Sequence, residues 1–231
     1  MAIYDDWGRC GGYYLSLYKS WGKCRNSTHT DVAVYSGNGQ YLHRFTTRAS
    51  TCLAIDSDGH VVVAQHGRRA IITFHCPSGE LIRQVNTSTR LGCRRATMAI
   101  NSKKHILIHT YPPSPYFTNT MVRCIDYSGN TLFTMFPNQL DKCLSGRGIV
   151  CDQSDNIYIA MCPTYPEDYY DGEYDETMAR SGRIHKYSPN GIFQQIVVRD
   201  QNPHYDLAIT ADGSLVFPDR QNSIYICREW L

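Results

Sequence analysis

The feature that most constrains this chain is an internal repeat with a period of roughly 45 to 60 residues. Each copy opens on a short apolar run with a small residue at its centre, as in Leu53-Ala54-Ile55 and Leu207-Ala208-Ile209. A polar turn and a second apolar run follow, which is typical of hairpins. No segment keeps an apolar period of about 3.6 residues, so we expect almost no helix. The centres of the five copies are 52, 45, 51 and 58 residues apart: Ala2, Ala54, Ala99, Val150 and Ala208.

A second hairpin follows the first in four of the copies, over residues 32–45, 71–85, 122–136 and 184–196. Its turn holds Gly39, Gly79, Gly129 or Gly191, where a left-handed backbone costs little. Four antiparallel strands per unit at this period predict an all-β fold, a β-propeller of four-stranded blades. We expect one domain over residues 1–231 with five recognisable blades, at about 1–45, 52–85, 97–136, 148–198 and 205–231. The last blade shows only three strands, so a fragment of a six-bladed ring is the alternative.

The same residues resemble the NHL-repeat family of β-propellers, of the kind found at the C-terminus of tripartite-motif (TRIM-NHL) proteins. The resemblance rests on Leu53-Ala54-Ile55-Asp56 with its Asp-Gly turn, and on the hairpin Tyr35-Ser36-Gly37-Asn38-Gly39-Gln40-Tyr41-Leu42. It covers nearly the whole chain. It implies a recognition module that is not itself an enzyme and that binds RNA or a client protein, with a ubiquitin ligase as a candidate parent protein.

Charge is divided unequally along the chain. Residues 1–110 carry 14 Lys and Arg against 6 Asp and Glu, whereas residues 111–231 carry 9 against 15. When the four strands of each unit are lettered a to d along the chain, the b–c and d–a loops share one face of the meander. The a–b and c–d turns are predicted to be short and every long insertion to fall in the b–c and d–a loops, so we expect function on that face. These loops are predicted at 19–30, 65–70, 111–120, 162–182 and 218–222, and at 46–50, 86–96, 137–147 and 199–205.

Basic and aromatic residues gather in these loops. Arginine binds phosphate in a bidentate manner, and exposed aromatic rings stack on unpaired bases, so the set favours RNA. A solvated basic surface without a ligand is the alternative. The candidate RNA- or partner-binding residues are Lys23, Arg25, Arg48, His66, Arg68, Arg69, Arg90, Arg94 and Arg95, with Trp21 and Tyr111.

The insertion at residues 163–176 has the opposite character, with six acidic residues, four tyrosines and no Lys or Arg. It would repel phosphate, so four interpretations are open. It could bind a basic protein partner, coordinate a hard cation, fold back on the neighbouring basic residues or be a plain solvated loop. No EF-hand spacing is present. As an alternative partner-binding loop it contributes Glu167, Asp168, Tyr169, Tyr170, Asp171, Glu173 and Tyr174.

The sequence lacks the common catalytic and metal-binding motifs. The ten cysteines form no Cys-x-x-Cys pair, and the sequence has no Walker loop and no Gly-x-Ser-x-Gly motif. We therefore expect no metal, no cofactor and no small-molecule ligand, with an extracellular or metal-dependent propeller enzyme as the third-ranked function. No stretch approaches the ~20 apolar residues of a membrane helix, and residues 1–6 do not resemble a signal peptide, so no membrane partner is expected. A cytoplasmic location is the expectation, and secretion is the alternative because of the cysteines and the two sequons at Asn26 and Asn86.

Overall fold

The computed structural model describes residues 2–3, 14–18, 29–36, 38–48, 50–65, 70–87, 95–111, 120–137, 144–163, 182–199, 201, 203, 207–218 and 223–228. Over these ranges the chain forms antiparallel sheets and no helix, so the predicted all-β propeller is confirmed. The described residues include no helix long and apolar enough to cross a membrane.

Four of the sheets have four strands and the fifth has three, each in chain order. The first contains β1 (Ala2–Ile3), β2 (Tyr14–Tyr18), β3 (His29–Tyr35) and β4 (Tyr41–Arg48). The second contains β5 (Ser50–Ile55), β6 (Val61–Gln65), β7 (Ile71–His75) and β8 (Leu81–Asn86). The third contains β9 (Arg95–Ile100), β10 (Ile106–Tyr111), β11 (Met121–Ile125) and β12 (Thr131–Met135). The fourth contains β13 (Leu144–Cys151), β14 (Ile157–Pro163), β15 (Arg183–Tyr187) and β16 (Phe193–Val198), and the fifth β17 (Ala208–Ile209), β18 (Leu215–Pro218) and β19 (Ile224–Cys227).

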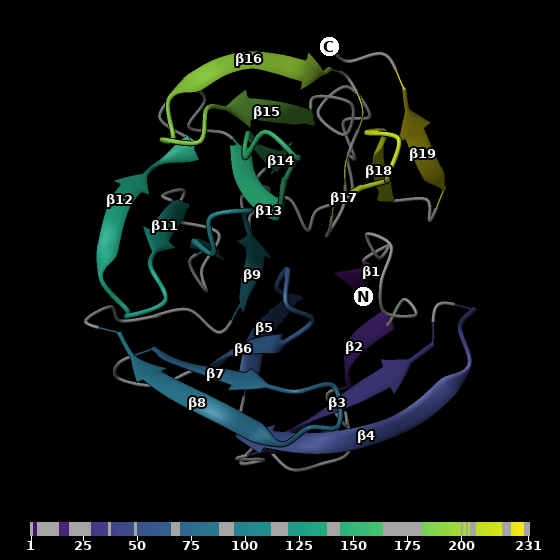
Figure 1. Ribbon diagram of the computed structural model, residues 1–231. Coiled ribbons are helices and arrows are strands. Elements are labelled where there is room, and N and C mark those ends of the chain that lie inside the picture. Colours follow the sequence, from purple (N-terminus) through teal and green to yellow (C-terminus); the bar gives the residue numbers. More distant parts are fainter. Residues whose placement is uncertain are drawn as a thin grey trace, which may run out of the picture.

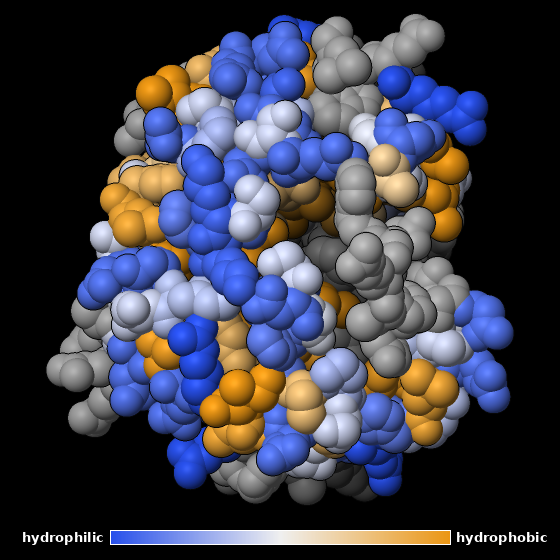
Figure 2. Space-filling view, viewed as in Figure 1, coloured by the Kyte–Doolittle hydropathy of each residue, from blue (hydrophilic) through white to orange (hydrophobic). Residues whose placement is uncertain are grey.

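The sheets are arranged around a centre, with the first strand of each innermost and the last outermost (Figure 1). Middle strands such as β6 are apolar and fully buried, because a neighbouring sheet covers each face. Outer strands are amphipathic, and Leu81, Ile82 and Leu132 remain about half exposed on them. In the same view, hydrophilic side chains cover much of the visible face and apolar ones form separate patches (Figure 2).

Buried apolar clusters join each sheet to the next one in the chain. Val32 and Val34 of the first sheet pack with Val61 and Val63 of the second. Three further clusters connect the second sheet to the third, the third to the fourth and the fourth to the fifth. None of the four clusters found among the described residues connects the fifth sheet to the first. Consecutive sheets are therefore packed as propeller blades.

Eight five-residue turns, at 36–40, 56–60, 76–80, 101–105, 126–130, 152–156, 188–192 and 210–214, form one end of the molecule, called here the short-turn end. In each, the fourth residue donates its N–H to the carbonyl of the first, and the first donates to the carbonyl of the fifth. The fourth residue has a positive φ, as in Gly79 (92°) and Lys104 (59°). This is a type I turn closed by a bulge, which is why glycine is common there. The predicted glycine positions are confirmed.

The opposite end, called here the long-loop end, holds the connections between the second and third strands of each sheet and those from one sheet to the next. The prediction of a loop over residues 46–50 was wrong, because β4 continues to Arg48 and β5 begins at Ser50. Paired strands also extend into the expected loops at 86–96 and 137–147, where β9 begins at Arg95 and β13 at Leu144. The prediction that every long insertion falls in the b–c and d–a loops was wrong, because residues 4–13 join β1 to β2, the first two strands of the first sheet.

Candidate functional site

Three residues of the predicted RNA-binding set lie in described strands at the long-loop end. Arg48 is the last residue of β4 and is exposed. Arg95 begins β9 and Tyr111 ends β10, and the two occupy directly opposed positions in the antiparallel register. The backbone pairing thus places Arg95 and Tyr111 opposite each other in the third blade, while Arg48 belongs to the first. These positions were predicted as loop residues, and the structure places them at strand ends because each has a pairing partner.

The other predicted residues lie outside the described part of the chain. They are Trp21, Lys23, Arg25, His66, Arg68, Arg69, Arg90 and Arg94 of the basic set, and Glu167, Asp168, Tyr169, Tyr170, Asp171, Glu173 and Tyr174 of the acidic insertion. Their roles remain predictions.

Three further arginines at or near the long-loop end were missed by sequence reasoning. Arg183 begins β15, Arg199 directly follows β16 and is exposed, and Arg123 is the third residue of β11. Burial lowers the pKa of Arg123, whose guanidinium donates to the Met121 sulfur at 3.6 Å. Arg183 and Arg199 lie directly beside long connections in the acidic half of the chain. This proximity could have identified them from the sequence.

A buried imidazole lies between the third and fourth blades. His109 of β10 has no exposed surface, and it packs against Gly146 of β13. A Cβ atom added to Gly146 would lie 2.1 Å from the His109 ring carbon Cε1. Glycine is therefore required at this position for the two inner strands to approach each other.

At the short-turn end, the first residue of each turn between an inner strand and the next accepts backbone hydrogen bonds. Asp56 Oδ1 accepts from the N–H groups of Asp58 (3.0 Å) and His60 (2.8 Å), and Asn101 and Asp152 act in the same way in the next two blades. Short carboxylate and amide side chains are common at the start of such turns because they accept hydrogen bonds from the backbone a few residues further on.

Three ligand atoms of Asp56, Asp58 and His60 lie within 4.8 Å of one another, a grouping that would suit a divalent cation. Two groups from the third blade already occupy it. The Lys104 ammonium lies 2.5 Å from Asp58 Oδ2, and the Tyr127 hydroxyl donates to Asp56 Oδ2 at 2.9 Å. The hydrogen bond and charge of Lys104 lower the pKa of the Asp58 carboxyl, and burial raises that of Tyr127. The cluster therefore joins two blades, with Lys104 supplying the positive charge.

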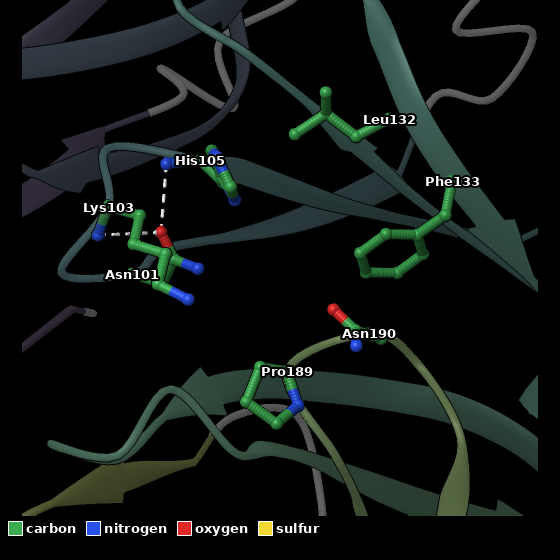
Figure 3. A pocket seen from close by; sticks show the side chains of 7 residues that line it. All are labelled: Asn101, Lys103, His105, Leu132, Phe133, Pro189 and Asn190. Carbon is green, nitrogen blue, oxygen red and sulfur yellow. Dashed lines mark hydrogen bonds between the residues drawn. The ribbon is translucent and has the colours of Figure 1, made fainter.

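A cavity of about 190 Å³ lies at the short-turn end between the third and fourth blades. Figure 3 shows Asn101, Lys103 and His105 of one turn on one side of it, with Leu132, Phe133, Pro189 and Asn190 around the remainder. Asn101 Oδ1 accepts from the N–H groups of Lys103 (3.1 Å) and His105 (2.8 Å), so its amide nitrogen is left to donate elsewhere. No acidic side chain lines the cavity.

No protein-family model matches this sequence, and no curated protein is significantly similar to it. Solved structures share its fold. A protein of unknown function from Bacteroides caccae matches 84% of the chain with a TM-score of 0.53 and 15% identity. The Dos1 propeller matches 86% of the chain with a TM-score of 0.53 and 13% identity. The chain spans 64% and 51% of the lengths of these two structures, and the likeness at this identity concerns the fold alone.

Proposed function

We propose that this propeller is a recognition module that binds single-stranded RNA through its long-loop end and performs no catalysis itself. The observation that carries the proposal is the opposed placement of Arg95 and Tyr111 at that end. The exposed Arg48 and the basic residues of the adjoining connections support it. The resemblance to NHL-repeat propellers, with a ubiquitin ligase as parent protein, belongs to the same proposal.

The chemistry follows from these residue types. An arginine guanidinium binds a phosphate through two parallel hydrogen bonds, and a tyrosine ring stacks on a base of any identity. Arginines recurring at the ends of successive blades would follow a strand of phosphates around the long-loop end. Such a surface binds unpaired nucleic acid with strong salt dependence and modest sequence preference.

A titration of fluorescently labelled single-stranded RNA, followed by anisotropy, tests the proposal. With about four phosphate contacts, affinity should fall roughly 50-fold between 50 and 200 mM salt. Arg95→Glu, and the double change Arg68→Glu with Arg69→Glu, should each weaken binding at least tenfold without altering thermal unfolding. Arg228→Glu is the matched control, because Arg228 is exposed and follows β19 at the short-turn end. Equal affinity of all four proteins would overturn the proposal.

A client protein is the second candidate, favoured by the acidic insertion after β14. This connection runs from residue 164 to 182, the longest between described strands, and its residues 164–176 carry no Lys or Arg. Deleting residues 165–176 separates the two candidates. Loss of a client in a pull-down with RNA affinity retained supports the protein partner, and unchanged capture of the client rejects it.

A cytoplasmic setting is part of the proposal. Six described cysteines carry free thiols, and burial raises the pKa of Cys124 to about 12. Buried, protonated thiols of this kind act as small apolar side chains and suit a reducing compartment. Counting reactive thiols in the denatured, unreduced protein tests the setting, since a secreted form would hide most of them in disulfides.

A further inference from the structure

The cavity between the third and fourth blades has a counterpart between the second and third, and there the space is filled. The equivalent turn position to Pro189 is Tyr127, the second residue of its five-residue turn. The Tyr127 ring contacts the Phe74 ring, with 4.8 Å between the two centroids. The Arg83 guanidinium contacts both rings, at 4.8 Å from the Tyr127 centroid and 4.0 Å from the Phe74 centroid. Its hydroxyl donates to Asp56 Oδ2 at 2.9 Å. A phenol is thus the group that this blade junction accommodates.

At the next junction the residues that would supply such a phenol are replaced. Pro189 occupies the position of Tyr127, because each is the second residue of its five-residue turn. Phe133 occupies the position of Arg83, because each is the third residue after the turn that leads into its outer strand. The glycine of the turn, Gly191, still packs on the outer strand, since a Cβ there would lie 2.8 Å from the Phe133 ring. The blades therefore approach in the same way, while the space that a tyrosine fills at one junction is a cavity at the other.

The polarity of the site is also reversed. Asn101 replaces Asp56, so a side-chain amide donor stands where a carboxylate acceptor stands in the filled site. Lys103 replaces Asp58, and in the described residues no carboxylate lies within ion-pair distance of its ammonium, whereas its neighbour Lys104 lies 2.5 Å from Asp58. The nearby Asp155 is buried and both of its oxygens accept from Ser102, so it fixes the turn. The site therefore favours a ligand with a hydrogen-bond acceptor for the Asn101 amide and a negative charge for the Lys103 ammonium.

We propose that this cavity binds a tyrosine side chain carried on an acidic peptide segment. The ring takes the place that the Tyr127 ring has at the neighbouring junction and packs on Phe133 and Pro189. The phenol oxygen accepts a hydrogen bond from the Asn101 amide, and a carboxylate beside the tyrosine pairs with Lys103. The site is at the end opposite the proposed RNA surface, so either proposal can fail without the other.

The test is a titration of the acetylated and amidated peptide Asp-Glu-Tyr-Glu-Asp into the full chain, followed by amide chemical shifts in nuclear magnetic resonance spectra. We expect shifts confined to the turns at 101–105 and 188–192 and the start of β12. Peptides with alanine in place of tyrosine, or lysines in place of the acidic residues, should bind at least tenfold more weakly. Shifts that map to the long-loop end, or equal binding of the three peptides, would overturn the proposal.

Two variants of the protein complete the test. Lys103→Glu changes an exposed side chain and should weaken the acidic peptide about three- to tenfold, as expected for reversing one partly solvated ion pair. Pro189→Tyr should restore the arrangement of the filled junction and abolish binding. Arg228→Glu, an equal charge change outside the cavity, should leave the affinity unchanged. If both Lys103→Glu and Pro189→Tyr bind the acidic peptide as tightly as the parent protein, the proposed binding site is wrong. If Pro189→Tyr does not fold, unchanged affinity of Lys103→Glu is sufficient to reject the site.

Discussion

Replacing Gly79 by alanine tests how consecutive blades pack. Gly79 has a φ of 92°, and a Cβ atom there would lie 2.5 Å from both Cβ and Cγ of Phe45, on the outer strand of the preceding blade. Alanine in the left-handed region costs about 1–2 kcal/mol, and forcing a methyl group into a packed contact costs about 1–3 kcal/mol more. The free energy of unfolding should therefore fall by about 2–5 kcal/mol.

Gly39 provides the matched control for this prediction. It occupies the same turn position in the first blade with a φ of 82°, and a Cβ there meets nothing within 4 Å. Gly39→Ala should therefore lose only the backbone contribution of about 1–2 kcal/mol. Urea unfolding followed by far-ultraviolet circular dichroism measures both variants. Equal losses in the two variants would show that the contact between Gly79 and Phe45 contributes nothing to stability and would contradict this prediction.

Three other perturbations have defined outcomes. Gly146→Ala should lower the melting temperature strongly, because its Cβ would overlap the buried His109 ring, and retention of the parent value would contradict that packing. Tyr127→Phe should lower the free energy of unfolding in urea by about 1–3 kcal/mol, because the buried Asp56 Oδ2 loses one hydrogen-bond donor. An unchanged free energy would show that this hydrogen bond does not stabilise the blade junction. Burial lowers the pKa of His75 in the folded protein, so on acidification the unfolded chain binds a proton at this histidine at a higher pH than the folded protein does. Stability should therefore be level above pH 6.5 and fall as the pH drops below it. His75→Gln should flatten this slope in melting curves recorded from pH 7.5 to 5, and an unchanged slope would assign it to other groups.

The strands and turns of this chain were predictable because the information is local. Runs such as Val61–Gln65 and the glycines of the five-residue turns determine hairpins from neighbouring residues alone. Strand ends were less predictable. Arg48 and Arg95 are polar and were expected in loops, and only their pairing with His29 and Tyr111 extends the strands over them.

The short-turn cavity could not be predicted, because it depends on residues that are brought together only by blade packing. Asn101 and Pro189 are far apart in the sequence, and neither has a local signature of a binding site. The cavity exists because Tyr127 fills the space at one blade junction, whereas Pro189 leaves the equivalent space open at the next. The Ser102–Asp155 and Lys104–Asp58 bonds between blades were hidden for the same reason.

Hydrogen–deuterium exchange of the full chain with and without single-stranded RNA maps the RNA-binding surface without a mutation. RNA bound at the long-loop end should slow exchange around Arg48, Arg95 and Tyr111. Exchange in the turns at 56–60 and 101–105, at the short-turn end, should not change. Protection of those turns alone, or no protection anywhere at saturating RNA, would contradict the claim that the long-loop end is the RNA-binding surface.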